Sequence, residues 1–185
     1  LGSKNISTNM VIPIDQHFNV KGVGLVAIGY VQSGTVNKHD EVIILPAKET
    51  GVVRSLQVMD DDVDSAIAGD RVGVALRNLR EESLHRGCMI IHPESQALIR
   101  HDNSKIKIKT APFQKRKLTN EDVIHAAVDL QFVVGRIKRV EGDLISVEWE
   151  NPLWIRAVGS PQILITQLDA MPMRIIGSVE TIEQA

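Results

Sequence analysis

The chain is built from short apolar runs separated by turn-forming residues. In the first half, strand-like runs cover residues 11–14, 18–31, 41–45, 52–58, 71–77 and 88–91. The runs at 52–58 and 71–77 alternate apolar and polar positions, which is typical of strands with one buried face. The long run 18–31 contains Gly22, Gly24 and Gly29, and glycines inside a strand indicate bulges or close backbone approach. About six short strands with turns between them predict a small antiparallel barrel.

A connector, His92-Pro93-Glu94-Ser95, interrupts this pattern, which then restarts. Strict alternation of basic and apolar residues at 104–109 predicts a strand, and further candidates lie at 128–140, 144–149, 163–168 and 173–182. Residues 119–127 are ambiguous, because Thr119 and Asp122 have the spacing of a helical capping box. We predict an all-β chain of two small antiparallel barrels in tandem, residues 1–93 and 94–185, joined near residues 93–97.

Composition narrows the class of protein. The 185 residues suit either one large domain or two of about 90 each. With six aromatic residues, the cores must be filled by Val, Ile and Leu. A net charge of −2 argues against coating nucleic acid by charge alone, so any RNA contact must use local patches. The single cysteine, Cys88, excludes an internal disulfide and suits a reducing cytoplasm.

Targeting signals are lacking in the sequence. No apolar run reaches the roughly 18 residues of a membrane span, and the start LGSKNISTN does not have the form of a secretory signal. We therefore expect a cytoplasmic protein with no membrane partner. Because the first residue is Leu1 rather than Met, we interpret the chain as a fragment of a longer protein.

Residues Asn37-Lys38-His39-Asp40 have the form N-K-x-D, which GTPases use to hold guanine. A guanine motif follows a buried strand, whereas here the apolar run 41–45 comes after it. No phosphate loop of the form G-x-x-x-x-G-K-[ST] exists, and the Gly22-x-Gly24 pair is followed by strand-like residues instead of a helix. We predict a hairpin turn at residues 37–40. No zinc spacing or nucleophile elbow occurs, so we predict no catalytic residues in this chain.

Five segments in order resemble the second domain of the elongation factor Tu superfamily of translational GTPases: PIDQHFNVKGVGLVAIGYVQSGTV, DEVIILP, VRSLQV, AIAGDRVGVALRNL and LHRGCMI. In the second half, KTAPFQKRK, VIHAAVDLQFVVGRI and MPMRIIGSV resemble the third domain of the same superfamily. The segments RSLQV and GDRVG resemble the selenocysteine-specific (SelB-like) branch. The resemblance implies two Greek-key barrels, with residues 123–128 in a strand, and a G domain before Leu1 that would bind GTP and Mg.

The resemblance also implies a binding site for aminoacyl-tRNA. The matching positions of the amino-acid pocket are Asp15, Gln16, Phe18, Ile28 and Arg71, where Arg71 would favour an anionic or oxygen-rich side chain. Simple pairing of Arg71 with Asp70 or Asp15 is the alternative. Positions that match contacts to the acceptor end of tRNA are Gly22, Gly24, Gln57, Arg86 and Gly87. For Arg86, a solvated turn residue remains an equally simple interpretation.

Basic residues of the second half form two groups that suit contacts to the tRNA T arm. The first group is Lys115, Arg116 and Lys117, and the second is Arg136, Lys138 and Arg139. A solvated face or a guarded strand edge would give the same pattern. The function implied is delivery of a specialised aminoacyl-tRNA to the ribosome, with GTP hydrolysis in the preceding domain and no cofactor in this chain. The alternative is a set of protein-interaction barrels in a degenerate GTPase-like regulator that does not bind tRNA.

Overall fold

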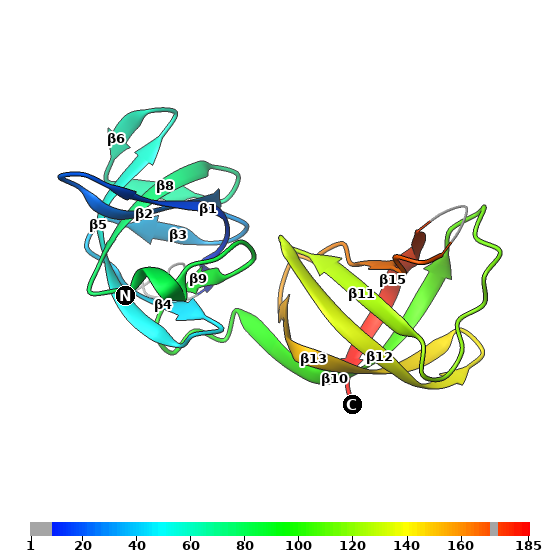
Figure 1. Ribbon diagram of the computed structural model, residues 1–185. Helices are drawn as coiled ribbons and strands as arrows, with labels where there is room; N and C mark the ends of the chain where they lie inside the picture. The colour runs from blue at the N-terminus through cyan, green and yellow to red at the C-terminus, as the bar shows by residue number, and fades with distance from the viewer. Residues whose placement is uncertain (1–8, 171–173) are drawn as a thin grey trace. The chain divides into compact units, whose positions relative to one another are not determined.

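The computed structural model describes residues 9–170 and 174–185 (Figure 1). Most of the start LGSKNISTN, and the first three residues of the segment MPMRIIGSV, where the predicted strand 173–182 begins, lie outside the described residues. Strands dominate the described part of the chain. A short 3₁₀ turn, η2 (Glu81–Ser83), interrupts them. None of the helical segments in those ranges has the length and apolarity needed to traverse a bilayer.

The chain divides into two compact units. The first comprises Leu1–Leu98 with Arg156–Gly159, and the second comprises Ile99–Ile155 with Ser160–Ala185. The short segment 156–159 joins the first unit because the amide of Ala157 donates to the carbonyl of Ala97 at 2.9 Å. The predicted boundary at residue 93 lies within the turn that precedes this division.

The first unit is a closed barrel, as predicted. Its strands pair in the order β4-β9-β1-β2-β8-β5, and pairing of β4 with β5 closes the barrel. Strand β6 pairs with β5 but is not part of the closed ladder. A separate pair, β3 with β7, completes the unit. The bounds are β1 (Val11–Val20), β2 (Gly24–Tyr30), β3 (Thr35–Asn37), β4 (Glu41–Leu45), β5 (Glu49–Val58), β6 (Asp61–Val63), β7 (Ser65–Ile67), β8 (Arg71–Arg77) and β9 (Met89–Ile91).

Aliphatic side chains fill this barrel, as the scarcity of aromatic residues required. Fully buried members of the core are Met10, Ile12, Ile14, Ile44, Leu56 and Ile90. Cys88 lies among them, and burial raises the pKa of its thiol. The side chain of this cysteine is therefore part of the packing.

The second unit is also a closed barrel, with the order β10-β13-β12-β11-β14-β15. Its strands are β10 (Leu98–Thr110), β11 (Val123–Val128), β12 (Gln131–Glu141), β13 (Leu144–Arg156), β14 (Leu164–Thr166) and β15 (Ile175–Gln184). The alternation at 104–109 has the predicted consequence: Ile106 and Ile108 are buried, whereas Lys105, Lys107 and Lys109 are exposed.

Two predicted strands are in fact hairpins. The run 18–31 is cut by the turn at residues 21–23, so the glycine-rich stretch contains the hairpin between β1 and β2, with Gly22 in the turn. The run 128–140 is cut by a two-residue turn at Asp129-Leu130, where both φ angles are positive. Both turns are short and have apolar residues on either side, which is why hydrophobic periodicity did not reveal them.

One turn with a terminal aspartate occurs three times, at residues 37–40, 67–70 and 119–122. In each, the carboxylate of the aspartate accepts from the first residue's amide, at 2.8 Å for Asp40, 2.9 Å for Asp70 and 3.0 Å for Asp122. The third residue has a φ of 76°, 99° or 69°, in the left-handed region. A strand starts directly after each aspartate. The N-K-x-D sequence is therefore one copy of a recurring turn, and the predicted turn at residues 37–40 is confirmed. It is not a hairpin, because β3 pairs with β7 whereas β4 pairs with β5 and β9.

The capping-box spacing at 119–122 belongs to this turn. Asp122 accepts from the amide of Thr119, the same bond that a capping box would make at a helix start. Here β11 follows, with burial that alternates along the strand. Asp40 has a further partner, because His92 Nε2 lies 2.8 Å from its carboxylate and ties the connector to the turn.

Replacing Asp40 by Ala should lower the free energy of unfolding by about 1–3 kcal/mol, because it leaves the Asn37 amide and the His92 ring without their acceptor. Urea unfolding measures this. Glu41→Ala is the matched control, since that side chain is exposed and has no hydrogen bond or ion pair among the described residues. Neither variant should change guanine-nucleotide binding by this chain, which we expect to be undetectable. Equal stability of the two variants would contradict the role of the turn.

Candidate functional site

Rows of side chains cross the outside of the first barrel, because residues opposite one another in a ladder point to the same face. Gln16 of β1 faces Ile28 of β2, and Ile28 faces Gly73 of β8. Gly73 in turn faces Gln57 of β5, which faces Asp62 of β6. Five strands that are scattered along the sequence thus contribute one row, in which three of the residues are sequence-predicted site positions.

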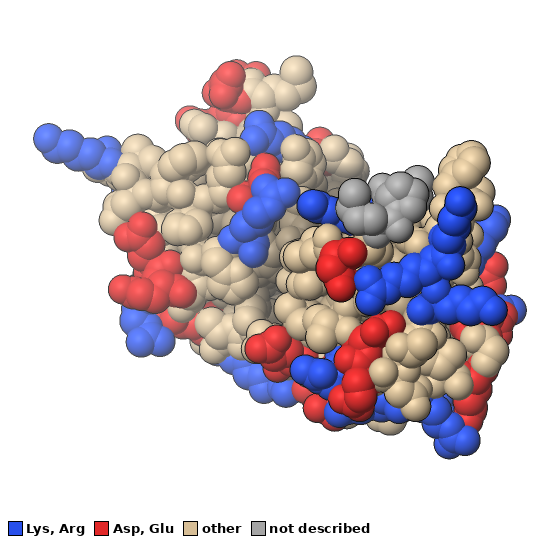
Figure 2. Space-filling view, turned by 45° about the vertical axis from the view of Figure 1, so that its right-hand side comes forward, with Lys and Arg blue, Asp and Glu red and all other residues tan. Residues whose placement is uncertain are grey.

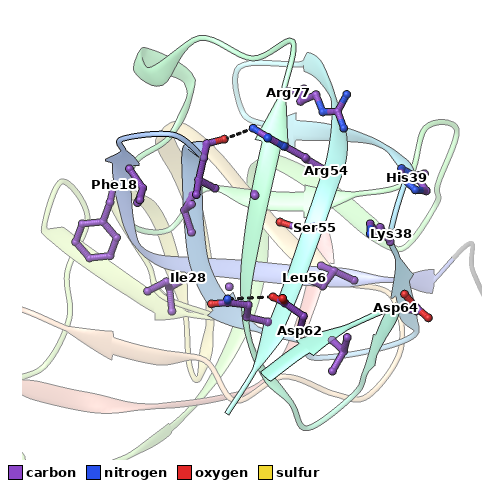
Figure 3. Close-up of a pocket in the computed structure, with 17 residues that line it drawn as sticks. Phe18, Ile28, Lys38, His39, Arg54, Ser55, Leu56, Asp62, Asp64 and Arg77 are labelled. Atoms are coloured by element: carbon purple, nitrogen blue, oxygen red, sulfur yellow. Dashed lines mark hydrogen bonds between the residues drawn. The ribbon is translucent and has the colours of Figure 1, made fainter. Parts of the chain in front are cut away.

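A groove of about 880 Å³ lies over this row (Figure 3). We call it groove A, and its lining includes Phe18, Ile28, Arg54, Gln57, Asp62 and Gly73. In the close-up, Phe18 and Ile28 lie on one side of the groove and Lys38, His39 and Asp64 on the other. Phe18 is 45% exposed although it is aromatic, so its ring is available to pack against a ligand.

The absence of a side chain at Gly73 deepens the row between Ile28 and Gln57. A Cβ placed there would meet only Gln57 Cβ, at 3.9 Å, which is ordinary contact. The φ of Gly73 is not in the left-handed region. The fold therefore does not require glycine here, and a side chain at this position would occupy the floor of groove A.

A second hollow of about 440 Å³ adjoins the first and shares Ile28, Gln57 and Gly73 with it. We call it groove B, and its other lining residues include Arg71, Asp60 and Met59. The guanidinium carbon of Arg71 lies 5.8 Å from the centre of the Tyr30 ring. Among the described residues Arg71 forms no ion pair, so the pairing with Asp70 or Asp15 that we considered is not observed. Its charge is available to a ligand in groove B.

The hairpin between β1 and β2 borders groove A. Gly22 and Gly24 have φ of 82° and 100°, and no atom lies within 4 Å of the place where a Cβ would stand on either. This open backbone allows a ligand to approach closely. Arg54 fixes the hairpin, because its Nη1 donates to the carbonyl of Val23 at 2.6 Å (Figure 3).

Arg54 reaches the groove because of a bulge. The register of β5 against β8 shifts between Val53 and Ser55, so Arg54 has no partner opposite it. The shift breaks the period-two alternation that the sequence predicts for 52–58, and Arg54, Ser55 and Gln57 all line groove A. A bulge inside an alternating run leaves no signal in a single sequence.

Asp15 and Arg86 form a pair of their own. Asp15 lies at a bulge of β1 between Ile14 and Gln16, and its carboxylate accepts from the guanidinium of Arg86. Gly87 follows, with a φ of 89°, and its amide donates to the carbonyl of Ile14 at 2.9 Å. Asp15, Arg86 and Gly87 therefore join β1 to the turn before β9, and none of the three lines groove A or groove B.

The two basic groups of the second barrel differ in their partners. In the loop after β10, Arg116 pairs with Asp169 at 3.2 Å, whereas Lys115 and Lys117 form no ion pair with any described residue. On β12, all three basic residues are paired. The distances are 3.7 Å for Arg136 to Glu121, 3.8 Å for Lys138 to Glu148 and 2.5 Å for Arg139 to Glu141.

The loop therefore keeps more free positive charge than the strand. Lys115, Arg116 and Lys117 line a hollow of about 520 Å³ together with Thr110 and Gln114. In Figure 2, basic side chains gather toward the upper right of the face in view, while acidic and basic side chains alternate along its lower edge. Within the described ranges, no group of three or more His, Cys, Asp or Glu side chains is arranged to hold a metal ion.

Comparison with known proteins agrees with this architecture. Residues 24–91 match the family model for elongation factor Tu domain 2. The chain is 34% identical over 134 residues to the selenocysteine-specific elongation factor of Methanocaldococcus jannaschii, covering 72% of the chain and 28% of that protein. It is 32% identical over 142 residues to an uncharacterised protein of the same organism, covering 77% and 45%. The chain thus spans less than half the length of either relative.

A solved structure has a similar fold. The apo form of translation elongation factor SelB from Methanococcus maripaludis is 28% identical, with a TM-score of 0.81 over 95% of this chain and 41% of that one. A bacterial selenocysteine-specific elongation factor with 21% identity and a TM-score of 0.79 shows the same fold.

Replacing Arg54 by Ala should speed hydrogen exchange of the Val23 amide by about tenfold, because the hairpin loses its link to β5. NMR-detected exchange measures this directly. Arg77→Ala is the control, since Arg77 lines groove A but its guanidinium makes no hydrogen bond or ion pair with the described residues. Unchanged exchange at Val23 in Arg54→Ala would show that the hairpin is held by its own turn alone.

Proposed function

We propose that this chain, which belongs to the elongation factor Tu superfamily, uses its two barrels to hold an aminoacyl-tRNA for delivery to the ribosome. The observation that carries the proposal is the pair of adjoining grooves on the first barrel. They share Ile28, Gln57 and Gly73, so one ligand can extend from one groove into the other.

In groove A, the chemistry suits the terminal nucleoside of the tRNA. Phe18 and Ile28 offer apolar surface to a base or a ribose, and the Gln57 amide offers hydrogen bonds beside them. The exposed backbone of the glycine hairpin lets the RNA strand come close. Arg86, at the side of the same barrel, is 64% exposed at its side chain and remains our candidate for the 5′ end.

Groove B suits the esterified amino acid. Arg71 lines this groove and forms no ion pair with a carboxylate among the described residues. Its guanidinium lies over the aromatic ring of Tyr30. A guanidinium in this setting favours a cargo side chain that is anionic or rich in oxygen. The name of one relative refers to selenocysteine, whose selenolate has this property. Gln16 faces Ile28 in the same row but lines neither groove, and Asp15 pairs with Arg86 outside both grooves.

The rest of the parent protein supplies the energy. We expect a G domain that binds GTP and Mg and hydrolyses GTP, because the selenocysteine-specific elongation factor that this chain resembles is more than twice as long. In this account the two barrels bind and release the tRNA without chemistry of their own, in the cytoplasm.

One observation favours the alternative, a degenerate GTPase-like regulator whose barrels bind protein and not tRNA. Arg136, Lys138 and Arg139 each lie within ion-pair distance of a neighbouring glutamate, which offsets part of the positive charge of this predicted contact surface. The sequence that precedes Leu1 separates the two proposals. An intact phosphate loop with a second N-K-x-D motif supports tRNA delivery, whereas eroded motifs support the regulator.

The full-length protein should bind a pool of aminoacyl-tRNA at least about tenfold more tightly than the same pool after deacylation. Gly73→Val should remove most of this preference, because the new side chain fills the floor shared by the grooves. Fluorescence titration measures both affinities. Thr50→Val, an exposed position on the same strand as Gln57 but outside both grooves, should have no effect. Equal binding of acylated and deacylated tRNA would refute the proposal.

The salt dependence of tRNA binding should distinguish the two basic groups. The double variant Lys115→Gln/Lys117→Gln should flatten the slope of log K against log salt by about 1–2, because two unpaired lysines lose their phosphate contacts. Lys138→Gln/Arg139→Gln should change the slope less, because both residues already have carboxylate partners. A larger change in the second variant would reverse the assignment.

A further inference from the structure

Gln57 lines both grooves and carries an amide side chain. An amide can present either of two groups to a ligand. Its –NH₂ donates hydrogen bonds and its carbonyl oxygen accepts them, and the two groups have almost the same shape. Which group faces the ligand decides whether Gln57 recognises a donor or an acceptor. The proposed function gives no answer to this choice, but the neighbouring strand does.

Asp62 on β6 removes the ambiguity. Gln57 Nε2 lies 3.1 Å from Asp62 Oδ1 (Figure 3). A carboxylate can only accept, so the Gln57 group that faces Asp62 must be the –NH₂. The carbonyl oxygen is then left for the ligand, and no described residue donates a hydrogen bond to it.

The short strand β6 holds Asp62 in this place. Its three residues pair only with β5, outside the ladder that closes the barrel. The pairing of Val58 with Asp61 and of Gln57 with Asp62 leaves a two-residue turn, Met59-Asp60, with φ of 52° and 65°. Such turns strongly prefer Asn-Gly or Asp-Gly, so this one carries backbone strain at both residues. A strained hairpin that barrel closure does not need sets the register that brings Asp62 against Gln57.

We infer that Asp62 is a positioning residue that fixes the Gln57 amide with its oxygen toward groove A, so that the site selects a ligand hydroxyl that donates. This inference rests on the proposed function and deepens it: the hydroxyl is a ribose hydroxyl of the terminal nucleoside of the tRNA. The pair thereby gives an amide the acceptor role that a carboxylate would have at the same position.

The test uses the full-length protein and one bulk tRNA pool, acylated on the 3′ oxygen and ending in either adenosine or 2′-deoxyadenosine. The wild type should prefer the ribose form by about three- to tenfold, the value of one neutral hydrogen bond. Asp62→Ala should lower this ratio toward one, because the freed amide no longer keeps its oxygen toward the hydroxyl. Gln57→Ala should do the same, and the double variant should lose nothing more. Asp61→Ala, the adjacent exposed aspartate, should keep the full ratio.

A rescue separates orientation from structural damage. In Gln57→Glu/Asp62→Asn the donor and acceptor exchange places, so the new glutamate again presents an oxygen to the groove and the ratio should return. Thermal unfolding of each variant confirms that the barrel persists. The inference is overturned if Asp62→Ala keeps the wild-type ratio, if the exchanged pair fails to restore it in a folded protein, or if the wild type shows no ribose preference. In all three cases a preference for acylated over deacylated tRNA would leave the proposed function standing.

Discussion

Closure of the first barrel by the pairing of β4 with β5 is the constraint on which the candidate site depends. A closed ladder leaves no freedom in the register, and each outward-facing row is set by it. Gln16, Ile28, Gly73 and Gln57 come from four strands of this closed ladder, yet they lie in one row across the barrel surface. The two grooves lie where a small residue, Gly73, stands between the larger side chains of Ile28 and Gln57 on the barrel surface.

Much of the fold could be predicted from sequence, because the signals were local. Apolar runs bounded by turn residues identified most strands, and the scarcity of aromatic residues predicted an aliphatic core. The turn at 37–40 was predictable from what followed it, since a strand begins after Asp40, as one also does after Asp70 and Asp122. Hairpins inside long apolar runs were missed, because a single turn-forming residue, Gly22 in one and Asp129 in the other, marks each turn between two strands. Periodicity alone left residues 119–127 open, since one aspartate–amide bond serves both a capping box and this turn.

The candidate site was only partly predictable, and the reason is physical. Resemblance to a family proposed Phe18, Ile28, Gln57 and Arg71, which the barrel places around adjoining grooves. Arg54 and Asp62 were not found. Arg54 reaches the groove through a bulge, and Asp62 reaches Gln57 through a strained two-residue turn. Both depend on a register shift or a backbone conformation that leaves no mark in one sequence. The ion pair of Lys138 with Glu148 is equally invisible in the sequence, because the ladder between β12 and β13 brings the two residues together.

The central claim is that the acylated end of a tRNA lies on the outer surface of the first barrel. Photo-crosslinking from a terminal adenosine that carries a reactive group on the base tests this most directly, with the crosslinked peptides identified by mass spectrometry. In the full-length protein bound to acylated tRNA, crosslinks should fall on residues 16–28, 54–57 and 71–77, and they should weaken strongly when the tRNA is deacylated. Crosslinks confined to residues 99–185, or equally strong crosslinks with and without the amino acid, would contradict the account.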